Sequence, residues 1–233
     1  MALKRLNKAI AETGFCSRRV ADQYIAEGKV TVNGKPCELG LRVGPFDVIC
    51  IDGEQITKTA PAVYLAYNKP VGITCTTDTS IEGNIITAIN YPERIFHVGR
   101  LDKPSEGLIF MTNDGDIVNQ ILRSENNHEK EYIVRVDKKI TNDFIEKMAS
   151  GVPILDTITK PCKVTKVNDY TFNIVLTQGL NRQIRRMCKH FDYEVYKLKR
   201  VRIMNIKLGD LPIGDYRNFT TEELTKLKQL IAS

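Results

Sequence analysis

The sequence lacks the apolar runs that mark membrane and secreted proteins. No stretch of its 233 residues approaches the roughly 18 apolar residues of a membrane helix. The first ten residues carry three basic side chains and no long apolar run, so they do not resemble a signal peptide. We therefore expect a cytoplasmic protein without a membrane partner.

Metal and cofactor motifs are also missing. The six cysteines are scattered, without a CxxC pair or a neighbouring histidine cluster, which argues against a zinc site and against a disulfide framework. Glycine-rich nucleotide-binding motifs, the HExxH zinc motif and the GxSxG nucleophile motif do not occur. The sequence therefore predicts no metal and no cofactor, and it favours small, buried apolar roles for the cysteines.

The positive charge is concentrated in one segment. The chain carries a net charge of +6, whereas residues 179–207 alone hold nine basic and two acidic side chains, a net charge of +7. Such a focused positive field suits a polyanion, most simply a nucleic acid. A solvated basic face is the alternative interpretation of the same pattern.

The first 56 residues predict a small domain of two helices and a short sheet. Apolar spacing predicts a helix over residues 4–13, and Ser17 can cap a second helix that Gly28 ends. Short strands follow at 30–32 and 48–51, with a turn at Asn33-Gly34. We expect these basic residues on the two helices to bind RNA: Lys4, Arg5, Lys8, Arg18 and Arg19. Residues 57–62 read as a linker.

A second domain is predicted over residues 63–233. Apolar runs indicate strands at 63–67, 95–98, 108–112, 132–136, 163–167 and 171–177. Helices are indicated at 85–90, 116–123 and 142–150, and Thr220 with Glu223 forms a capping box that opens a last helix. Because strands and helices do not alternate regularly, we predict an α+β fold with a mixed, mainly antiparallel sheet.

Residues 97–115 form the most unusual stretch, HVGRLDKPSEGLIFMTNDG. It places Asp102 in a loop between two strands, where an isolated aspartate is most often a turn residue. The segment GRLDKPSEGLIFMTNDG, however, resembles the catalytic motif of the bacterial ribosomal RNA pseudouridine synthases of the RsuA type. The chain has Ser105 where threonine is commoner in that family, a change that keeps the hydroxyl.

Four further motifs support the resemblance and follow in the family's order. Residues 68–72 (NKPVG), 130–134 (KEYIV) and 179–187 (GLNRQIRRM) resemble three motifs of the synthase domain, and residues 5–34 resemble an S4 RNA-binding domain. HEKEYIV, GLNRQIRRMC and RIMNI are most similar to the RluF subtype, which acts on large-subunit rRNA. The resemblance implies an S4 α/β domain followed by a pseudouridine synthase domain that isomerises uridine in an rRNA stem-loop, and we expect a monomer.

The resemblance also implies roles for individual residues. Asp102 would be the catalytic carboxylate, Arg185 its guanidinium partner, and Tyr132 the aromatic platform for a flipped uracil. Arg100 would fill the gap that the extruded base leaves. Whether Asp102 attacks C1′, attacks C6 or abstracts the 2′ proton stays open. Lys69, Asn181 and Gln183 either line the site or have structural roles.

The third motif reads as an amphipathic helix. A basic stripe at helical spacing comprises Arg182, Arg185, Arg186 and Lys189. An apolar stripe on the opposite face comprises Ile184, Met187, Cys188 and Phe191. The same spacing allows Arg185 to be an ordinary surface arginine. We expect Arg182, Arg186 and Lys189 to bind RNA phosphates.

Two other functions are weighed against the synthase. A non-catalytic RNA-binding protein in ribosome assembly or translational control would explain the S4 domain and the basic segment, but it would not need Asp102, Tyr132 and Arg185 together. A glycosidase-like hydrolase would need a second carboxylate. Asp114 and Asp116 lie downstream of Asp102 on the far side of a strand that spans roughly 17 Å.

Overall fold

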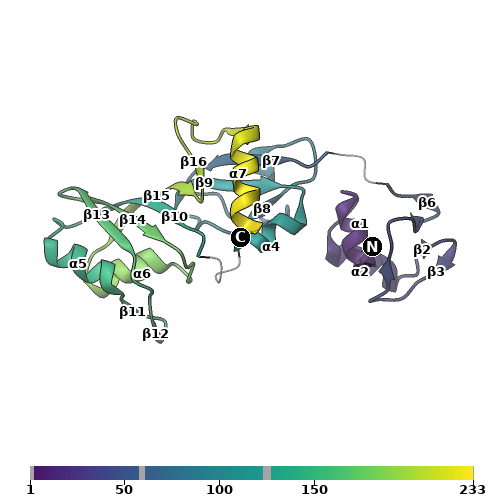
Figure 1. Ribbon diagram of the computed structural model, residues 1–233, viewed down its shortest axis with the longest axis horizontal. Helices are drawn as coiled ribbons and strands as arrows, with labels where there is room; N and C mark the ends of the chain where they lie inside the picture. Colours follow the sequence, from purple (N-terminus) through teal and green to yellow (C-terminus); the bar gives the residue numbers. More distant parts are fainter. Residues whose placement is uncertain (1–2, 58–60, 123–126, 233) are drawn as a thin grey trace. The chain divides into compact units, whose positions relative to one another are not determined.

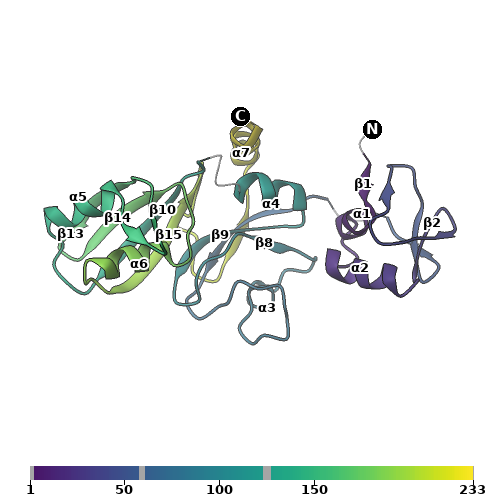
Figure 2. The same ribbon diagram turned by 90° about the horizontal axis from the view of Figure 1, so that it is seen from below.

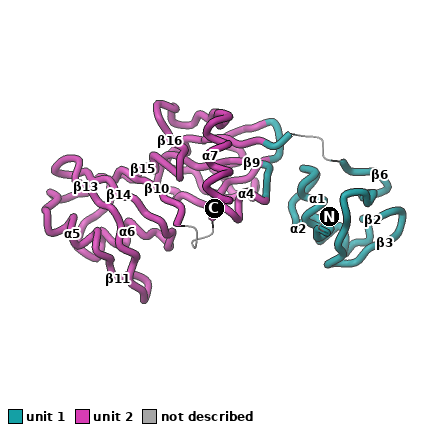
Figure 3. The backbone as a smooth tube through the Cα atoms, viewed as in Figure 1, with its two compact units in different colours: residues 1–62, 92–94, 113–115 teal, residues 63–91, 95–112, 116–233 magenta. Residues whose placement is uncertain are grey.

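The structure is a computed structural model that describes residues 3–57, 61–122 and 127–232. The backbone divides into two compact units (Figure 3). One unit comprises residues 1–62 with the short segments 92–94 and 113–115, and the other comprises the remaining residues. The expected linker, residues 57–62, lies partly outside the described residues, because the structure does not describe positions 58–60.

Two helices and a small sheet build the N-terminal unit. Helices α1 (Leu6–Glu12) and α2 (Arg18–Ala26) bury apolar side chains against the sheet, and the Ser17 side chain accepts a hydrogen bond from the Val20 backbone, as a helix cap should. The short strands are β1 (Lys4–Arg5), β2 (Val30–Val32), β3 (Lys35–Pro36), β4 (Arg42–Val43), β5 (Ile49–Ile51) and β6 (Glu54–Gln55). The sheet order is β3-β2-β5-β6, and β1 pairs with β4.

The turn that joins β2 and β3 is the one that the sequence predicts. Asn33 and Gly34 have φ angles of 53° and 75°. Positive φ at both central residues is the geometry of a two-residue hairpin turn, and asparagine and glycine are the residues that adopt it most readily. The Asn33 side chain also donates to Asp47 at 2.8 Å, which fixes the neighbouring loop.

A nine-stranded mixed sheet forms the second unit (Figure 1). Its main order is β13-β14-β10-β15-β9-β7-β17, with β16 paired to β15 and β8 paired to β9. The strands are β7 (Tyr64–Lys69), β8 (Phe96–Val98), β9 (Glu106–Thr112), β10 (Lys130–Val136), β13 (Lys163–Asn168), β14 (Thr171–Leu176), β15 (Val195–Ile203), β16 (Ile206–Lys207) and β17 (Tyr216–Asn218). A separate hairpin pairs β11 (Pro153–Ile154) with β12 (Thr157–Ile158). Only the β9–β15 pair is parallel among the described strands, which confirms the mixed, mainly antiparallel sheet.

Strand β9 is buried along its whole length because both faces of the sheet are covered. Ile109 and Met111 belong to one apolar core, and Leu108 and Phe110 belong to the other. Successive side chains of a strand point to opposite faces, so each face of β9 contributes to its own core. Figure 2 shows α4 (Gly115–Leu122) and α7 (Thr221–Ala232) on one side of β9 and α3 (Ile85–Ile89) on the other.

Each helix of the second unit packs its apolar side chains into one of these two cores. Helices α3, α5 and α6 bury Ile85, Phe144 and Met187 in the first core, and α4 and α7 bury Ile117 and Leu227 in the second. The helices are α3 (Ile85–Ile89), α4 (Gly115–Leu122), α5 (Asn142–Ser150), α6 (Gln183–His190) and α7 (Thr221–Ala232). The capping box of α7 is present, since the Glu223 backbone donates to Thr220 Oγ1 at 3.1 Å and the Thr220 backbone donates to the Glu223 carboxylate at 2.9 Å.

Candidate active site

The loop between β8 and β9 presents Asp102. It begins at Gly99, whose φ of +71° suits glycine, and the Ser105 backbone donates to the Asp102 carbonyl at 2.9 Å, which closes a tight turn. The Asp102 side chain is partly exposed, whereas Leu101 and Ser105 are buried. The turn therefore fixes the backbone of Asp102, while its carboxylate stays partly exposed to solvent.

Residues 69–75 anchor this loop from the side. The buried Cys75 thiol donates to the Leu101 carbonyl at 3.2 Å and accepts from the Leu101 backbone at 3.4 Å. The Gly72 backbone donates to the Lys103 carbonyl at 2.8 Å. These bonds fix the residues on both sides of Asp102, so the NKPVG motif acts on the site through the backbone.

Lys69 shapes that anchoring segment from inside the core. The side chain is fully buried, and its ammonium donates to the carbonyls of Pro70 at 2.7 Å and Ile73 at 2.9 Å. Burial lowers the pKa of Lys69, while the nearby carboxylates of Asp102 and Glu106 oppose this shift. Of the two roles left open for Lys69, these contacts favour the structural one.

Arg185 contacts the loop, but not in the way that the resemblance implies. Its guanidinium donates to the Val195 carbonyl at 3.0 Å, the Pro104 carbonyl at 3.1 Å and the Ser105 hydroxyl at 3.2 Å. Within the described part of the chain, no ion pair or hydrogen bond joins Arg185 to Asp102. Burial lowers the pKa of Arg185, and the charge of Asp102 raises it. The expected bidentate pair is therefore absent from this structure, because the two terminal nitrogens of the guanidinium already donate to Val195, Pro104 and Ser105.

The basic stripe of α6 divides into two parts. Ile184, Met187 and Cys188 are buried, as predicted for the apolar face. Arg182, Arg186 and Lys189 are exposed, but Arg185 is half-buried and so lies at the boundary between the two faces. Arg186 is held by Asn181, whose carbonyl and side-chain oxygens accept from it at 3.0 and 3.1 Å.

Strand β15 contributes Arg200, which is not among the site residues predicted from the sequence. Arg200 is 3% exposed, pairs across the sheet with Tyr132, and places its guanidinium 6.0 Å from the centre of the tyrosine ring. It donates to the Leu108 carbonyl at 2.6 Å and to the Arg100 carbonyl at 3.4 Å. Arg200 thus braces the start of the Asp102 loop against the central strands.

One pocket of about 500 Å³ is lined by five of the seven site residues predicted in this unit. Its lining includes Arg100, Asp102, Tyr132, Arg182 and Arg185. Lys130, Asn181, Gln183 and Arg200 also line it, whereas Arg186 and Lys189 lie outside the described lining. The structure therefore brings the three candidate catalytic residues together and leaves part of the phosphate-binding stripe on the surface beside them.

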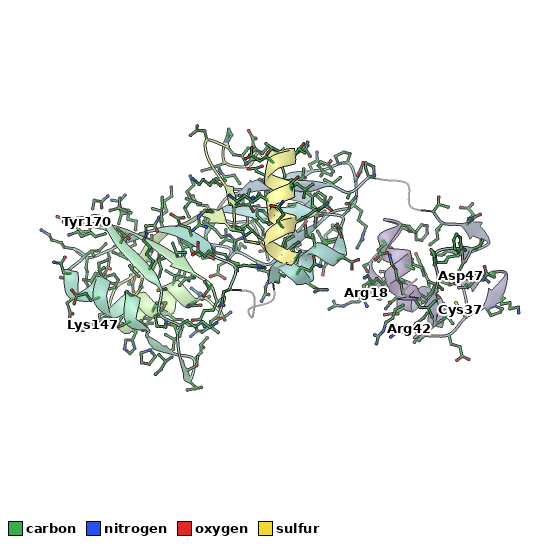
Figure 4. The ribbon with its side chains drawn as sticks, in the orientation of Figure 1. Arg18, Cys37, Arg42, Asp47, Lys147 and Tyr170 are labelled. Atoms are coloured by element: carbon green, nitrogen blue, oxygen red, sulfur yellow. The ribbon has the colours of Figure 1, made fainter. Side chains whose placement is uncertain are left out.

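The basic residues of the N-terminal unit are only partly where they were expected. Lys4 and Arg5 form strand β1 instead of helix, because the Leu6 backbone donates to the Leu41 carbonyl and draws the chain beside β4. Lys4 and Lys8 pair with Glu12 at 2.7 and 3.6 Å. Arg18 and Arg19 begin α2 and are exposed, and Figure 4 labels Arg18 and Arg42 on this unit.

All six cysteines lie within the described residues. Cys16, Cys75 and Cys188 are buried as expected, whereas Cys37, Cys50 and Cys162 are partly exposed, and all six are free thiols. Within residues 3–57, 61–122 and 127–232, no group of three or more His, Cys, Asp or Glu side chains could hold a metal ion. The same ranges contain no helix that is long and apolar enough to cross a membrane.

Comparison with known families gives the class of protein. Residues 63–190 match the RNA pseudouridylate synthase family, and residues 4–49 match the S4 domain. The chain therefore belongs to the RNA pseudouridylate synthase family. It is an RNA-modifying isomerase with an S4 RNA-binding domain, so the comparisons support the enzyme and not the non-catalytic alternative.

Individual relatives agree with this assignment. The dual-specificity RNA pseudouridine synthase RluF of Escherichia coli K12 is 54% identical over 97% of this chain and 79% of its own length. The ribosomal large subunit pseudouridine synthase B of Bacillus subtilis is 33% identical over 98% of this chain and 97% of its own. A crystal structure of a pseudouridylate synthase matches 96% of this chain and 99% of its own, at 29% identity and a TM-score of 0.71.

Proposed function

We propose that this chain isomerises uridine to pseudouridine at specific positions of large-subunit rRNA, with Asp102 as the catalytic carboxylate. The observation that carries the proposal is the pocket that combines Asp102, Tyr132 and several guanidinium groups. The name of the Bacillus subtilis relative, a ribosomal large subunit pseudouridine synthase, supports rRNA of the large subunit as the substrate class. We expect the enzyme to act as a monomer in the cytoplasm, where rRNA is made.

The reaction exchanges one bond for another within the same nucleotide. The bond between C1′ and N1 breaks, the base turns, C5 bonds to C1′, the C5 proton leaves and N1 takes up a proton. Atoms balance and no oxidant or reductant is needed. Asp102 supplies the carboxylate that such a cleavage requires next to the sugar and the base.

The uridine must leave the stacked RNA to reach Asp102. Enzymes that act on a base flip it out of the stack and read it in a pocket. Tyr132 would stack on the flipped uracil, a contact worth roughly 1–3 kcal/mol. Arg100 is exposed at the pocket, and Arg200 holds its carbonyl, so its side chain can enter the space that the base leaves.

We assign binding and chemistry to separate parts of the chain. Residues 1–56 would form the S4-like RNA-binding domain, residues 57–62 the linker and residues 63–233 the catalytic domain. Exposed Arg5, Arg18 and Arg19 offer phosphate contacts in the first, and exposed Arg182, Arg186 and Lys189 offer them beside the pocket. Lys4 and Lys8 contribute less in this scheme because Glu12 neutralises part of their charge.

A tritium-release assay tests the activity. Fragments of 23S rRNA are transcribed with uridine tritiated at C5 and incubated with the protein. We expect release of tritium to water in proportion to the pseudouridine found after digestion, from a single stem-loop of the large-subunit RNA. Release from small-subunit fragments instead would contradict the proposed substrate, and mapping pseudouridines in rRNA from cells with and without the gene identifies the position.

A further inference from the structure

Strand β10 presents a second charged side chain beside the tyrosine platform. Lys130 and Tyr132 are two residues apart on this strand and therefore point to the same face. Glu131, between them, points away and accepts hydrogen bonds from Arg202 at 2.7 Å and Asn173 at 2.7 Å. Lys130, Tyr132 and Arg200 all line the Asp102 pocket.

The charges of this pocket are strongly unbalanced. Asp102 is the one acidic side chain of its described lining, whereas Arg100, Lys103, Lys130, Arg182, Arg185 and Arg200 are cationic. A pocket lined mainly by cations stabilises a ligand group that is negative or becomes negative during the reaction.

The cations of the pocket differ in how many of their N–H groups already donate hydrogen bonds to the protein. Arg185 donates to three protein oxygens and Arg200 to two backbone carbonyls, and these bonds hold both groups to the fold. Each arginine keeps one buried nitrogen, Arg185 Nε or Arg200 Nη2, without a partner among the described residues. Lys130 is half-buried, and among the described residues its ammonium has a single long hydrogen bond, 3.5 Å to the His128 carbonyl. An ammonium carries three donors. A half-buried ammonium has lost part of its hydration, and an anionic ligand that accepts from the unused donors would compensate for that loss.

The electrostatic surroundings of Lys130 point the same way. Burial lowers the pKa of Lys130, and the nearby Arg200 lowers it further. An anion placed against Lys130 would remove part of this unfavourable energy. The charge that appears next to Tyr132 during the reaction belongs to the base, because breaking the bond between C1′ and N1 leaves the electron pair on the uracil, spread over N1, O2 and O4.

We propose that the Lys130 ammonium donates hydrogen bonds to the carbonyl edge of the flipped uracil and stabilises the uracil anion while the base is detached from C1′. Two residues of a strand span about 6.8 Å, a distance that a lysine side chain and the width of a base can bridge. Lys130 stays protonated throughout: C5 bonds to C1′, the C5 proton leaves, and N1 takes its proton from water. The inference rests on the proposed uridine isomerisation and on Tyr132 as the stacking partner.

Lys130→Met is the variant that tests this role, because methionine keeps the length and removes the charge. Lys130→Arg keeps the charge, and Lys163→Met, an exposed lysine on β13, is the matched control. The assay is tritium release from C5-labelled rRNA in a single turnover at saturating enzyme. We expect Lys130→Met to slow this step by about 100-fold, as the loss of one preorganised donor does elsewhere. RNA affinity should change less than about threefold, Lys130→Arg should restore part of the rate, and the control should match wild type.

Two further measurements separate chemistry from structure. The melting temperature of Lys130→Met should equal or exceed that of wild type, because the variant removes a poorly paired half-buried charge. With 5-fluorouridine at the target, the fluorine itself stabilises the base anion, so the defect of Lys130→Met, measured as loss of 5-fluorouridine from digested RNA, should shrink at least several-fold.

Each opposite result overturns the role of Lys130. A wild-type rate in Lys130→Met would exclude it, and a loss of RNA affinity alone would make Lys130 a phosphate contact. A lower melting temperature that accounts for the lost activity would show that Lys130 has a structural role. An undiminished defect with 5-fluorouridine would show that Lys130 does not stabilise the base anion. Failure of the proposed function is distinct, because the wild-type enzyme would then release no tritium.

Discussion

Replacing Arg185 with lysine should separate the loop that carries Asp102 from its support without removing a positive charge. The guanidinium spans two elements, since one terminal nitrogen donates to the Val195 carbonyl and the other to the Pro104 carbonyl and the Ser105 hydroxyl. A lysine ammonium is a point charge and cannot reproduce this planar fork. It can keep one of the two attachments, so the contacts of the other are lost.

The hydrogen bonds of Arg185 give the size of the effect. Loss of the contacts to Pro104 and Ser105 removes two bonds from a charged donor, each worth about 1.5–3 kcal/mol. Because Arg185 is half-buried, water replaces part of this energy. We expect the barrier to rise by about 2–4 kcal/mol, a decrease in rate of roughly 30- to 1,000-fold. Ser105→Ala removes one of these two bonds, about half of the energy, and should slow the reaction by roughly 5- to 30-fold.

Single-turnover tritium release and RNA binding, measured on the same variants, provide the assay. Arg185→Lys should change the rate far more than the dissociation constant. Lys189→Ala, on the exposed face of α6, should do the reverse, weakening binding and reducing the salt slope by up to about 0.9. If Arg185→Lys weakened binding as Lys189→Ala does and left the rate unchanged, Arg185 would be a surface phosphate contact and the account of the loop would be wrong.

Three further outcomes follow from the same structure. Gly107→Ala should destabilise the fold by about 2–4 kcal/mol, because φ is +111° and a Cβ would lie 2.3 Å from the Arg200 carbonyl oxygen. Calorimetry should show little change for Gly179→Ala, where the added atom meets nothing within 4 Å. Removing residues 1–56 should leave a cooperatively unfolding catalytic domain that binds its rRNA fragment less tightly and with a shallower salt dependence, and an unchanged slope would exclude the S4 domain from this RNA. Chelation by EDTA, with the RNA kept folded, should leave the rate unchanged, because the sequence carries no metal-binding motif and the step proposed for Asp102 uses no metal; a clear loss would contradict this.

Sequence reasoning found most of the elements whose apolar pattern is local. Strands such as β9, with one unbroken apolar run, and the capping box of α7 are visible without tertiary information. The strand β15 was missed because lysine and arginine occupy about half of its positions, a pattern that favours an exposed basic segment. Its central place in the sheet depends on pairing with β9 and β10, which are distant in sequence.

In the candidate site, too, the features that depend on contacts between distant segments could not be predicted from the sequence. The resemblance identified Asp102, Tyr132 and Arg185, and the structure places all three around one pocket. The resemblance could not show that Arg185 binds the Asp102 turn instead of the carboxylate, because that contact joins atoms from positions 80 residues apart. Arg200 was overlooked as a site residue because a buried arginine is rare, and here backbone carbonyls accept from it. The only sequence signal was its place in a basic segment.

Asp102→Asn tests the central claim most directly. Asparagine keeps the shape of the side chain, and the turn is closed by the Asp102 backbone, so the loop should keep its form. Under single-turnover conditions at saturating enzyme, we predict that tritium release from C5-labelled large-subunit rRNA falls by several orders of magnitude while RNA affinity stays near wild type. A variant that retained more than about a tenth of the wild-type rate, a barrier change below about 1.4 kcal/mol, would show that Asp102 is not the catalytic group.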